Sequence, residues 1–230
     1  MTLETIIFDL DGTLVNSDPD LANALNKLLA DYDMPALSHA QVCDMVGNGA
    51  WKLVERGFRA SDTPLPDELD KLVQRFIVYY NAALDVETTL YPNVIETLSQ
   101  LKAQGYKMGL CTNKPIGSTK KVLDAYNLAQ FMDVVVGGDS FSFKKPDGRH
   151  ITQLIDQMDC PLASAVMVGD SQNDVYAARD AGIPVIFLTH GYSRVSAKEL
   201  AADATLDNFS EILDALTKLS STDRVPDLKK

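Results

Sequence analysis

One stretch near the start of the chain carries most of the information about its fold: Ile6-Ile7-Phe8-Asp9-Leu10-Asp11-Gly12-Thr13-Leu14. The apolar residues predict a buried strand, and two carboxylates follow it, one residue apart. Because side chains alternate along a strand, Asp9 and Asp11 can point the same way where the strand ends. The alternative is that both acids are turn residues that close the strand, since Asp-Gly is favoured in turns.

Two carboxylates at this spacing repel each other and need a cation or a shared proton nearby. Mg²⁺ fits this need, because it takes hard oxygen ligands and binds through a few carboxylates together with substrate phosphate. From these residues alone we expect a metal-assisted phosphoryl-transfer site in which one carboxylate is free to act as a nucleophile. Which of Asp9 and Asp11 would attack is open at this point.

Composition narrows the classes of partner. The chain has 230 residues, of which 46% are hydrophobic, and a net charge of −11. This length allows one large domain or one domain with a smaller insertion. The negative charge argues against nucleic acid or an anionic membrane as a partner, because both require a basic face. We find no segment apolar enough to span a bilayer and no basic, apolar leader ahead of the first strand.

The three cysteines are too few and too widely spaced for a disulfide framework or a zinc site, at Cys43, Cys111 and Cys160. A reducing compartment suits such a protein. We therefore expect a cytoplasmic protein.

Strands and helices alternate along most of the chain. Five short apolar runs predict strands, at Thr5–Leu10, Tyr106–Cys111, Asp133–Val136, Ala165–Val168 and Ile183–Leu188. Four amphipathic stretches predict helices, at Asn93–Ala103, Ser118–Tyr126, His150–Met158 and Asp174–Ala181. This alternation predicts an α/β fold with a Rossmann-like parallel sheet, in which ligands bind at the carboxyl ends of the strands. Asp9, Thr112 and Asp170 each follow a predicted strand.

A helical segment interrupts this pattern after the first strand. Between Asn16 and Asp85 we find no strand pattern, and a loop of this length is not expected in a compact domain. Ser17 and Asp20 resemble a capping box, and Ala50–Phe58 and Asp67–Leu84 predict further helices, separated by Ser61-Asp62-Thr63-Pro64. We expect a core of residues 1–15 and 87–220, a helical cap of residues 16–86 and a polar tail of residues 221–230. Val15–Ser17 and Val86–Tyr91 are the expected hinges.

Three further segments add polar groups after predicted strands or before predicted helices: Thr112-Asn113-Lys114, Lys144-Lys145-Pro146 and Gly169-Asp170-Ser171-Gln172-Asn173-Asp174. Thr112 and Asn113 can donate hydrogen bonds to phosphate oxygens, and Lys145 offers a cation. Taken one at a time, each segment has a plainer interpretation as a helix cap, a solvated surface pair or a turn.

Together, in this order and at these distances, four motifs resemble those of the haloacid dehalogenase superfamily: Asp9-x-Asp11-Gly12-Thr13, Thr112-Asn113, Lys145-Pro146 and Gly169-Asp170-Ser171-x-x-Asp174. The resemblance implies that Asp9 is the nucleophile and forms an aspartyl-phosphate. Asp11 would be the general acid for the leaving alcohol and then the base for water. An acid at position 11 indicates a phosphatase or phosphomutase rather than a dehalogenase or a transport ATPase.

The resemblance also implies the ligands of the site. Mg²⁺ would be held by Asp9, Asp170 and the backbone carbonyl of Asp11, while Asp174 would orient the waters of the metal or Lys145. Charge on the transferring phosphoryl group would be neutralised by Thr112, Asn113 and Lys145.

The helical insertion resembles the cap of the branch that contains phosphoglycolate phosphatases and β-phosphoglucomutases. Gly47-Asn48-Gly49 opens a predicted helix and can present backbone N–H groups to an anion. Lys52 and Arg56 lie one helical turn apart and are candidates for binding a substrate carboxylate. The plainer interpretation is a turn between two helices.

Some residues depart from the pattern of this branch. Gly148-Arg149 stands where a second proline is usual, which leaves the start of the following helix open, and Asn16 stands where Asp is usual. We assign no catalytic role to His150 or His190, because the mechanism needs no imidazole.

Taken with the residues that carry it, the resemblance implies a Mg²⁺-dependent phosphomonoesterase acting on a small phosphorylated metabolite, with 2-phosphoglycolate as the first candidate. The alternatives are a phosphomutase, a phosphatase of sugar phosphates, nucleotides or pyrophosphate, and a phosphate-binding protein without turnover. We expect a small-molecule phosphomonoester as the partner, and a monomer or a homodimer.

Overall fold

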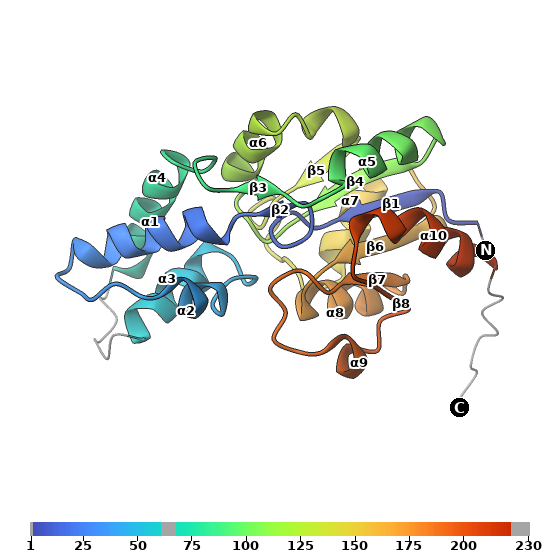
Figure 1. Ribbon diagram of the computed structural model, residues 1–230. Helices are drawn as coiled ribbons and strands as arrows, with labels where there is room; N and C mark the ends of the chain where they lie inside the picture. Colours follow the sequence, from blue (N-terminus) through green and yellow to red (C-terminus); the bar gives the residue numbers. More distant parts are fainter. Residues whose placement is uncertain (1, 61–67, 222–230) are drawn as a thin grey trace.

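The computed structural model describes residues 2–60 and 68–221 (Figure 1). Within them, six strands form one parallel sheet in the order β5-β4-β1-β6-β7-β8. Their bounds are β1 Thr5–Phe8, β4 Lys107–Cys111, β5 Val134–Val136, β6 Ala165–Gly169, β7 Val185–Leu188 and β8 Ala204–Leu206. The predicted α/β fold and its five strands are confirmed, and the sixth strand, β8, was not predicted.

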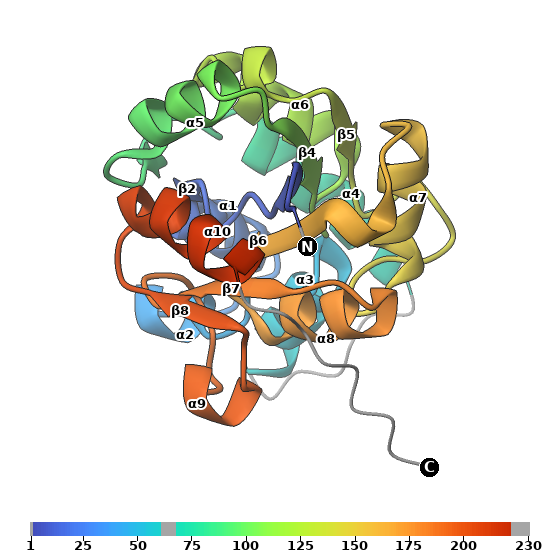
Figure 2. The same cartoon turned by 90° about the vertical axis from the view of Figure 1, so that its right-hand side faces the viewer.

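Alternating side chains of the central strand β1 bury both faces of this sheet. Ile6 and Phe8 belong to one apolar cluster and Ile7 to another, all of them fully buried. Helices α5, α6 and α10 pack on the first face, and α7 and α8 on the second (Figure 2). Both faces are covered, which is why the strands consist of continuous apolar runs.

The helices of the sheet region lie close to the predicted ranges. Their bounds are α5 Val94–Ala103, α6 Ile116–Ala125, α7 Arg149–Gln157 and α8 Gln172–Ala181. The question left open at Gly148-Arg149 is answered, because α7 begins at Arg149. Short elements and a last helix complete the chain, at η1 Ala129–Phe131, η2 Leu162–Ser164, α9 Ala197–Leu200, η3 Phe209–Glu211 and α10 Ile212–Ser221. Of the predicted polar tail, Ser221 ends α10 and the rest lies outside the described residues.

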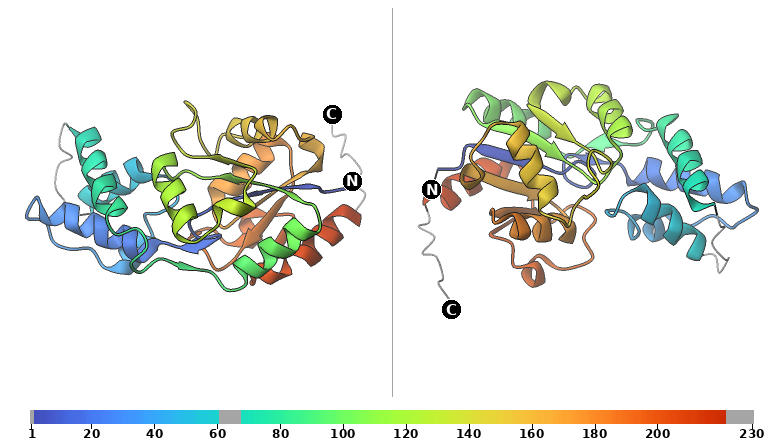
Figure 3. Two further views of the ribbon diagram at one scale, coloured as in Figure 1. Left: turned by 90° about the horizontal axis from the view of Figure 1, so that it is seen from above. Right: turned by 180° about the vertical axis from the view of Figure 1, so that it is seen from behind.

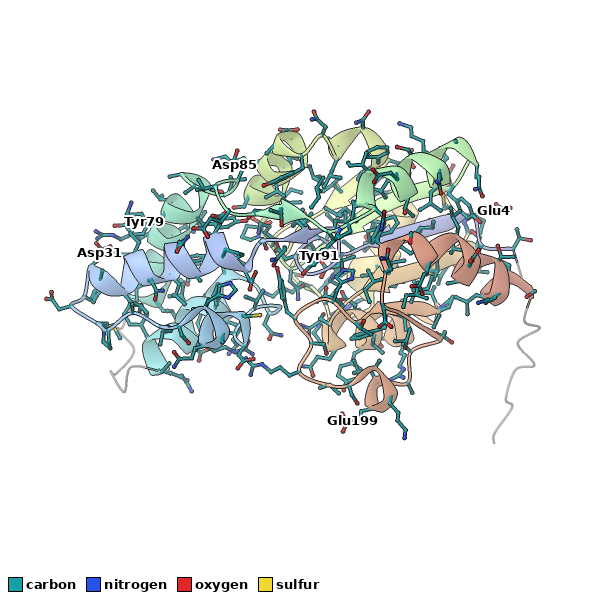
Figure 4. The ribbon with its side chains drawn as sticks, in the orientation of Figure 1. Glu4, Asp31, Tyr79, Asp85, Tyr91 and Glu199 are labelled. Carbon is teal, nitrogen blue, oxygen red and sulfur yellow. The ribbon has the colours of Figure 1, made fainter. Side chains whose placement is uncertain are left out.

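In its described residues, 16–60 and 68–86, the predicted insertion forms four helices that lie beside one end of the sheet (Figures 1 and 3). They are α1 Asp18–Ala30, α2 His39–Cys43, α3 Ala50–Arg59 and α4 Leu69–Asn81. Buried apolar side chains such as Leu25, Phe58 and Phe76 hold them together. Near the far end of the group, the Tyr79 hydroxyl donates a hydrogen bond to Asp31 Oδ2 at 2.6 Å (Figure 4).

The two predicted hinge segments pair with each other. β2 (Val15–Asn16) and β3 (Thr89–Leu90) form a short antiparallel ladder that joins Val15 to Leu90 and Asn16 to Thr89. The chain therefore leaves the sheet region before α1 and returns to it after α4 at neighbouring points. Tyr91 follows this ladder and lies between the helical group and the sheet (Figure 4).

Two local predictions within the insertion are wrong. Ser17 is the N-cap residue of α1, but its side chain makes no capping hydrogen bond; its hydroxyl is directed at Asp11 and donates to Oδ1. Asp20 accepts hydrogen bonds from the backbone N–H groups of Glu87 and Thr88. The last predicted helix ends at Asn81 rather than Leu84, whereas Asp67 and Ser61-Asp62-Thr63-Pro64 lie outside the described residues. No helix in the described ranges is long and apolar enough to cross a membrane.

Candidate active site

Three neighbouring strands place the predicted polar residues at one edge of the sheet. Asp9 follows β1, Thr112 follows β4 and Asp170 follows β6, and β1 lies between the other two strands. Asp174 lies in the first turn of α8, which begins directly after Asp170-Ser171. Ligand oxygens of Asp9, Asp170 and Asp174 lie within 4.8 Å of one another, and all three residues are buried. The structure thus brings together acids that are 161 to 165 positions apart from Asp9 in the chain.

Lys145 is the cation inside this acidic cluster. Its Nζ atom lies 3.0 Å from Asp9 Oδ1 and 2.6 Å from Asp174 Oδ1, and the residue is 2% exposed. The other oxygen of Asp174 accepts hydrogen bonds from the Ser171 backbone N–H, at 2.9 Å, and from the Ser171 hydroxyl, at 2.7 Å. With both oxygens engaged, Asp174 holds the Lys145 ammonium beside Asp9.

The electrostatics of the cluster are unbalanced, because three buried carboxylates face one ammonium. Burial raises the pKa of Asp9 to about 7, with Lys145 opposing the change and Asp174 adding to it. Burial, and then the charges of Asp174 and Asp9, raise the pKa of Asp170 well above its ordinary value. A divalent cation would relieve this repulsion, and carboxylates are the ligands that Mg²⁺ prefers.

The local geometry fits such an ion. Asp9 Oδ1 is buried and, apart from the Lys145 ammonium 3.0 Å away, has no polar partner among the described residues. Asp170 is oriented by two donors, the Thr13 hydroxyl at 2.8 Å from Oδ1 and the Tyr192 backbone N–H at 2.8 Å from Oδ2. A side chain at Gly12 would meet Asp170, since a Cβ there would lie 2.3 Å from Oδ2. Only glycine lets the backbone after Asp11 approach this carboxylate.

Asp11 is held apart from the acidic cluster by partners of its own. Lys114 Nζ lies 2.9 Å from its Oδ1 atom and 3.1 Å from Oδ2, and the Ser17 hydroxyl donates to Oδ1 at 2.5 Å. The Lys114 side chain is 4% exposed, and its ammonium lies 4.3 Å from the centre of the Tyr80 ring. Burial opposes the charge on Lys114, but Asp11 raises the pKa of Lys114 above its ordinary value.

Lys114 was not assigned a role from the sequence, although it directly follows Thr112 and Asn113. A lysine beside a strand end usually lies on the solvated surface. The only signal was its position next to two candidate phosphate ligands, and the carboxylate it neutralises is 103 positions away.

Thr112 and Asn113 lie in the cleft beside Asp9, as predicted. The Thr112 hydroxyl accepts a hydrogen bond from the Lys114 backbone N–H at 3.2 Å. The Asn113 side-chain amide donates to the Lys145 carbonyl at 3.0 Å and to the Gly47 carbonyl at 3.1 Å. In this conformation the Asn113 amide therefore joins three of the predicted segments to one another.

The Gly47-Asn48-Gly49 turn contacts the sheet region directly. The Gly47 carbonyl accepts hydrogen bonds from the side-chain amides of Asn113 and Asn173, both at 3.1 Å. Gly49 is the N-cap residue of α3 and has a φ of 84°. A Cβ on Gly49 would lie 2.9 Å from the Asn113 carbonyl oxygen. The turn needs glycine there for both its backbone conformation and its close contact.

Of the two cations predicted on α3, the structure brings one to the cleft. Arg56 lines it and donates to the Met45 carbonyl at 2.7 Å and to Asn48 Oδ1 at 2.8 Å, so that it braces the turn. The Lys52 ammonium pairs with Glu55 Oε2 at 2.7 Å, its side chain is 49% exposed, and it does not line the cleft.

The cleft between the helical group and the sheet has two lobes that share Asp9, Asp11, Val46 and Gly47. We call the first the apolar lobe; it is also lined by Leu21, Leu53, Phe76, Tyr80, Thr112 and Lys114. We call the second the polar lobe; it is also lined by Asn48, Arg56, Asp170, Asn173, Tyr192 and Arg194. Because Asp9 lines both lobes, a group bound there would have access to both.

Tyr192 links the acidic cluster to the segment Asn16–Asp18 at the start of the insertion, and it was not assigned a role from the sequence. Its backbone N–H donates to Asp170, and its hydroxyl accepts from the backbone N–H groups of Ser17, at 2.8 Å, and Asp18, at 3.2 Å. The same hydroxyl donates to Asn16 Oδ1 at 2.9 Å. A tyrosine from the loop after β7 thus caps the first helix of the insertion.

His150 and His190, which were given no catalytic role, have structural contacts. His150 Nδ1 accepts from the Lys145 backbone N–H at 3.3 Å, and its Nε2 lies 3.1 Å from the Gly137 carbonyl oxygen. Burial lowers the pKa of His150 to about 4, which keeps the ring neutral. The His190 ring packs against Tyr91, with ring centres 4.0 Å apart.

A family model described as haloacid dehalogenase-like hydrolase matches residues 6–188. The chain belongs to this family. Among curated proteins, a phosphoglycolate phosphatase of Caulobacter vibrioides is 42% identical over 219 residues, which are 94% of this chain and 92% of that protein. A phosphoglycolate phosphatase of Agrobacterium fabrum is 38% identical over 91% of each chain.

A solved structure is similar to this chain in both fold and sequence. The crystal structure of a predicted phosphoglycolate phosphatase from Haemophilus somnus superimposes with a TM-score of 0.88 and is 36% identical, covering 93% of this chain and 98% of that one. The relatives match nearly the whole length of the chain, so the helical insertion is part of the similarity.

Proposed function

We propose that this haloacid dehalogenase-like hydrolase is a Mg²⁺-dependent phosphomonoesterase that hydrolyses 2-phosphoglycolate to glycolate and phosphate through an aspartyl-phosphate. The names of its relatives support the substrate. The observation that carries the chemistry is the separation of two carboxylates in one cleft. Asp9 lies among buried acids beside Lys145, whereas Asp11 is held by Lys114 and Ser17. Two carboxylates in different environments can perform two different tasks.

In the first step, an Asp9 oxygen attacks phosphorus and the bond from phosphorus to the glycolate oxygen breaks. Asp11 begins this step in its protonated form and gives its proton to the departing alkoxide, so that it ends as a carboxylate, and Asp9 carries the phosphoryl group. In the second step, Asp11 removes a proton from water as the water oxygen attacks phosphorus, which releases phosphate and restores Asp9. General acid–base catalysis of this kind contributes roughly 10²–10⁴-fold to the rate.

Other residues position the Lys145 ammonium and neutralise the charge of the phosphoryl group. Asp174 holds Lys145 beside Asp9, and Lys145 with Thr112 balances charge on the transferring phosphoryl group. Mg²⁺, held by Asp9, Asp170 and the Asp11 backbone carbonyl, would supply the remaining positive charge. The helices of residues 16–86 would act as a cap that limits water around Asp9 while it is phosphorylated.

The free thiol state of Cys43, Cys111 and Cys160 supports the proposal of a reducing, cytoplasmic location. The proposed partner is a small phosphorylated acid.

The test is phosphate release from 2-phosphoglycolate in the presence of Mg²⁺. We expect Asp9→Asn to lower kcat by at least roughly 1,000-fold, because the nucleophile is lost. Asp11→Asn should lower it by about 10²–10⁴-fold. Asp156→Asn, on the exposed side of α7, is the matched control and should leave kcat unchanged.

Rapid quenching should trap a phosphoryl group on wild-type protein and none on Asp9→Asn. Interconversion of sugar phosphates without release of phosphate would instead support the phosphomutase alternative. Full activity in excess EDTA would refute the metal assignment.

A further inference from the structure

Two arginines from opposite sides of the cleft line the polar lobe. Arg56 comes from α3 of the insertion, and Arg194 comes from the loop that follows β7. The same lobe reaches Asp9 and Asp11. Burial, and then the positive charge of Arg194, lower the pKa of Arg56, which indicates that the two guanidinium groups interact. Two positive side chains that line one pocket repel each other, so an anion bound between them would be stabilised.

The other cations that line the cleft already have buried carboxylate partners. Lys145, beside the cleft, is paired with Asp9 and Asp174, and Lys114 in the apolar lobe is paired with Asp11. These pairs leave little positive charge for a second anionic group of a substrate.

The arginines of the polar lobe differ. Within the described residues, Arg56 donates hydrogen bonds to two uncharged oxygens, those of Met45 and Asn48. The Arg194 Nε atom lies 3.9 Å from Asp44 Oδ1, and the two side chains are 56% and 72% exposed. A pair this long and exposed contributes little. Asp9, Asp11, Asp44 and Asp170 also line the polar lobe, but among the described residues the long Asp44–Arg194 pair is the one ion pair that either arginine forms with them. The two guanidinium groups themselves are therefore only weakly paired.

We propose that Arg56 and Arg194 bind the carboxylate of the substrate between them, which makes the polar lobe a specificity pocket for phosphorylated hydroxy acids. This inference rests on the proposed function. Two guanidinium groups can bind the two oxygens of one carboxylate with charge-assisted hydrogen bonds. The phosphate then lies at Asp9, and the carboxylate lies in the same cleft, on the side of Tyr192 and Asn48.

The arrangement also explains how the substrate can join two parts of the molecule. Arg56 belongs to helix α3 of the insertion, whereas Arg194 belongs to the loop that contains Tyr192. A bound carboxylate connects them, but an uncharged group at the same position cannot. Lys52, the other cation of α3 that was predicted for this role, is paired with Glu55 outside the cleft.

The experiment compares two substrates of similar size, 2-phosphoglycolate and 2-hydroxyethyl phosphate, which replaces the carboxylate by an uncharged hydroxymethyl group. We expect Arg194→Gln to raise the KM for 2-phosphoglycolate about tenfold, since a hydrogen bond to a charged group contributes roughly 1.5 kcal/mol or more. The KM for 2-hydroxyethyl phosphate and both kcat values should change less than about twofold, because an interaction made equally in the ground and transition states affects KM alone.

Arg56→Lys is the second variant and should give the same split between the two substrates, because it keeps the charge but loses the two-pronged contact. Arg59→Gln is the matched control. Arg59 lies on the same helix and pairs with Glu55, so its removal should leave both KM values unchanged.

Three results would overturn the inference: no change in Arg194→Gln, equal changes for both substrates, or a rise in the KM for 2-phosphoglycolate in Lys52→Gln without one in Arg194→Gln. The behaviour of wild-type protein separates this inference from the proposed function. If wild-type protein prefers a different phosphorylated hydroxy acid, such as 3-phosphoglycerate, with the same dependence on Arg194, the pocket stands and the substrate assignment fails. If it prefers 2-hydroxyethyl phosphate to every carboxylated substrate, both fail.

Discussion

The buried ion pair between Lys114 and Asp11 gives the sharpest stability prediction. Lys114→Met removes the ammonium but keeps a side chain of similar length and volume. Asp11 then retains the Ser17 hydroxyl and loses the cation that contacts both of its oxygens. The same change removes the cation from the face of the Tyr80 ring. The fold around the pair should stay intact while its charge balance is lost.

The size of the effect follows from burial. Removing one partner of a fully buried pair costs roughly 3–5 kcal/mol. The side chain of Asp11 is 15% exposed and keeps one hydrogen bond, so we expect a smaller loss of about 2–3 kcal/mol in the free energy of unfolding. For a chain of this size, roughly 2–4 °C per kcal/mol gives a fall in Tm of about 4–12 °C.

Urea unfolding followed by circular dichroism, together with calorimetry, measures both quantities. In a double-mutant cycle with Asp11→Asn, the double variant should lose about 1–3 kcal/mol less than the sum of the single losses, because each single variant leaves a partner unpaired. Lys52→Met is the matched control. It also removes a lysine in an ion pair, but an exposed one, and should produce no resolvable change.

If Lys114→Met is as silent as Lys52→Met, or if the losses in the cycle simply add, the assignment of Lys114 as the counter-charge of Asp11 is refuted.

Three more predictions concern pH, metal and the hinge. His150 is neutral in the folded protein with a pKa of about 4, whereas an unfolded histidine takes up a proton near pH 6.5, so the free energy of unfolding should fall as pH drops from about 6.5 to about 4. His150→Gln should flatten this dependence, and an unchanged slope in urea unfolding series would contradict it. Mg²⁺ at 100 times its Kd should stabilise wild-type protein by about 2.7 kcal/mol and Asp170→Asn by clearly less, which thermal shift assays measure; equal shifts would exclude Asp170 as a ligand. Tyr192→Phe removes the acceptor at the start of α1 and should cost roughly 1–3 kcal/mol, whereas Tyr176→Phe, which is 45% exposed, should cost nothing measurable; similar values for the two variants would refute the linking role of Tyr192.

The sheet was predictable from the sequence because its central strands are buried on both faces. Each is a continuous apolar run, as in Thr5–Phe8 and Ala165–Gly169, and the run itself signals the strand. β8 was missed because the signal is absent at the edge of the sheet. Ala204–Leu206 is partly exposed, and it is a strand only because β7 offers it hydrogen-bonding partners.

The residues of the candidate site also fall into two groups, those that the sequence indicated and those that it did not. Asp9, Thr112 and Asp170 were found because each directly follows a strand, and parallel strands bring such residues to one edge. Lys114 and Tyr192 were missed because their roles come from partners far away in the sequence, at Asp11 and at the hinge.

Ser17 shows how a tertiary contact can override a local pattern. A serine three residues before an acid fits a capping box. In the folded protein, however, the Ser17 hydroxyl donates a hydrogen bond to the Asp11 carboxylate and makes no capping contact. The Tyr192 hydroxyl accepts the hydrogen bonds of the backbone N–H groups at the start of α1 instead. No sequence pattern around Ser17 indicates a partner that lies so far away in the chain.

The two-residue ladder between β2 and β3 has a consequence for how such a chain can be assembled. Val15 pairs with Leu90 and Asn16 with Thr89. The two strands that flank the helical insertion are therefore aligned as in a β-hairpin. A tight reverse turn could close that hairpin, and the parallel sheet needs no strand from the intervening residues. We therefore expect a shorter or unrelated segment between Asn16 and Thr89 to leave the order of the strands unchanged.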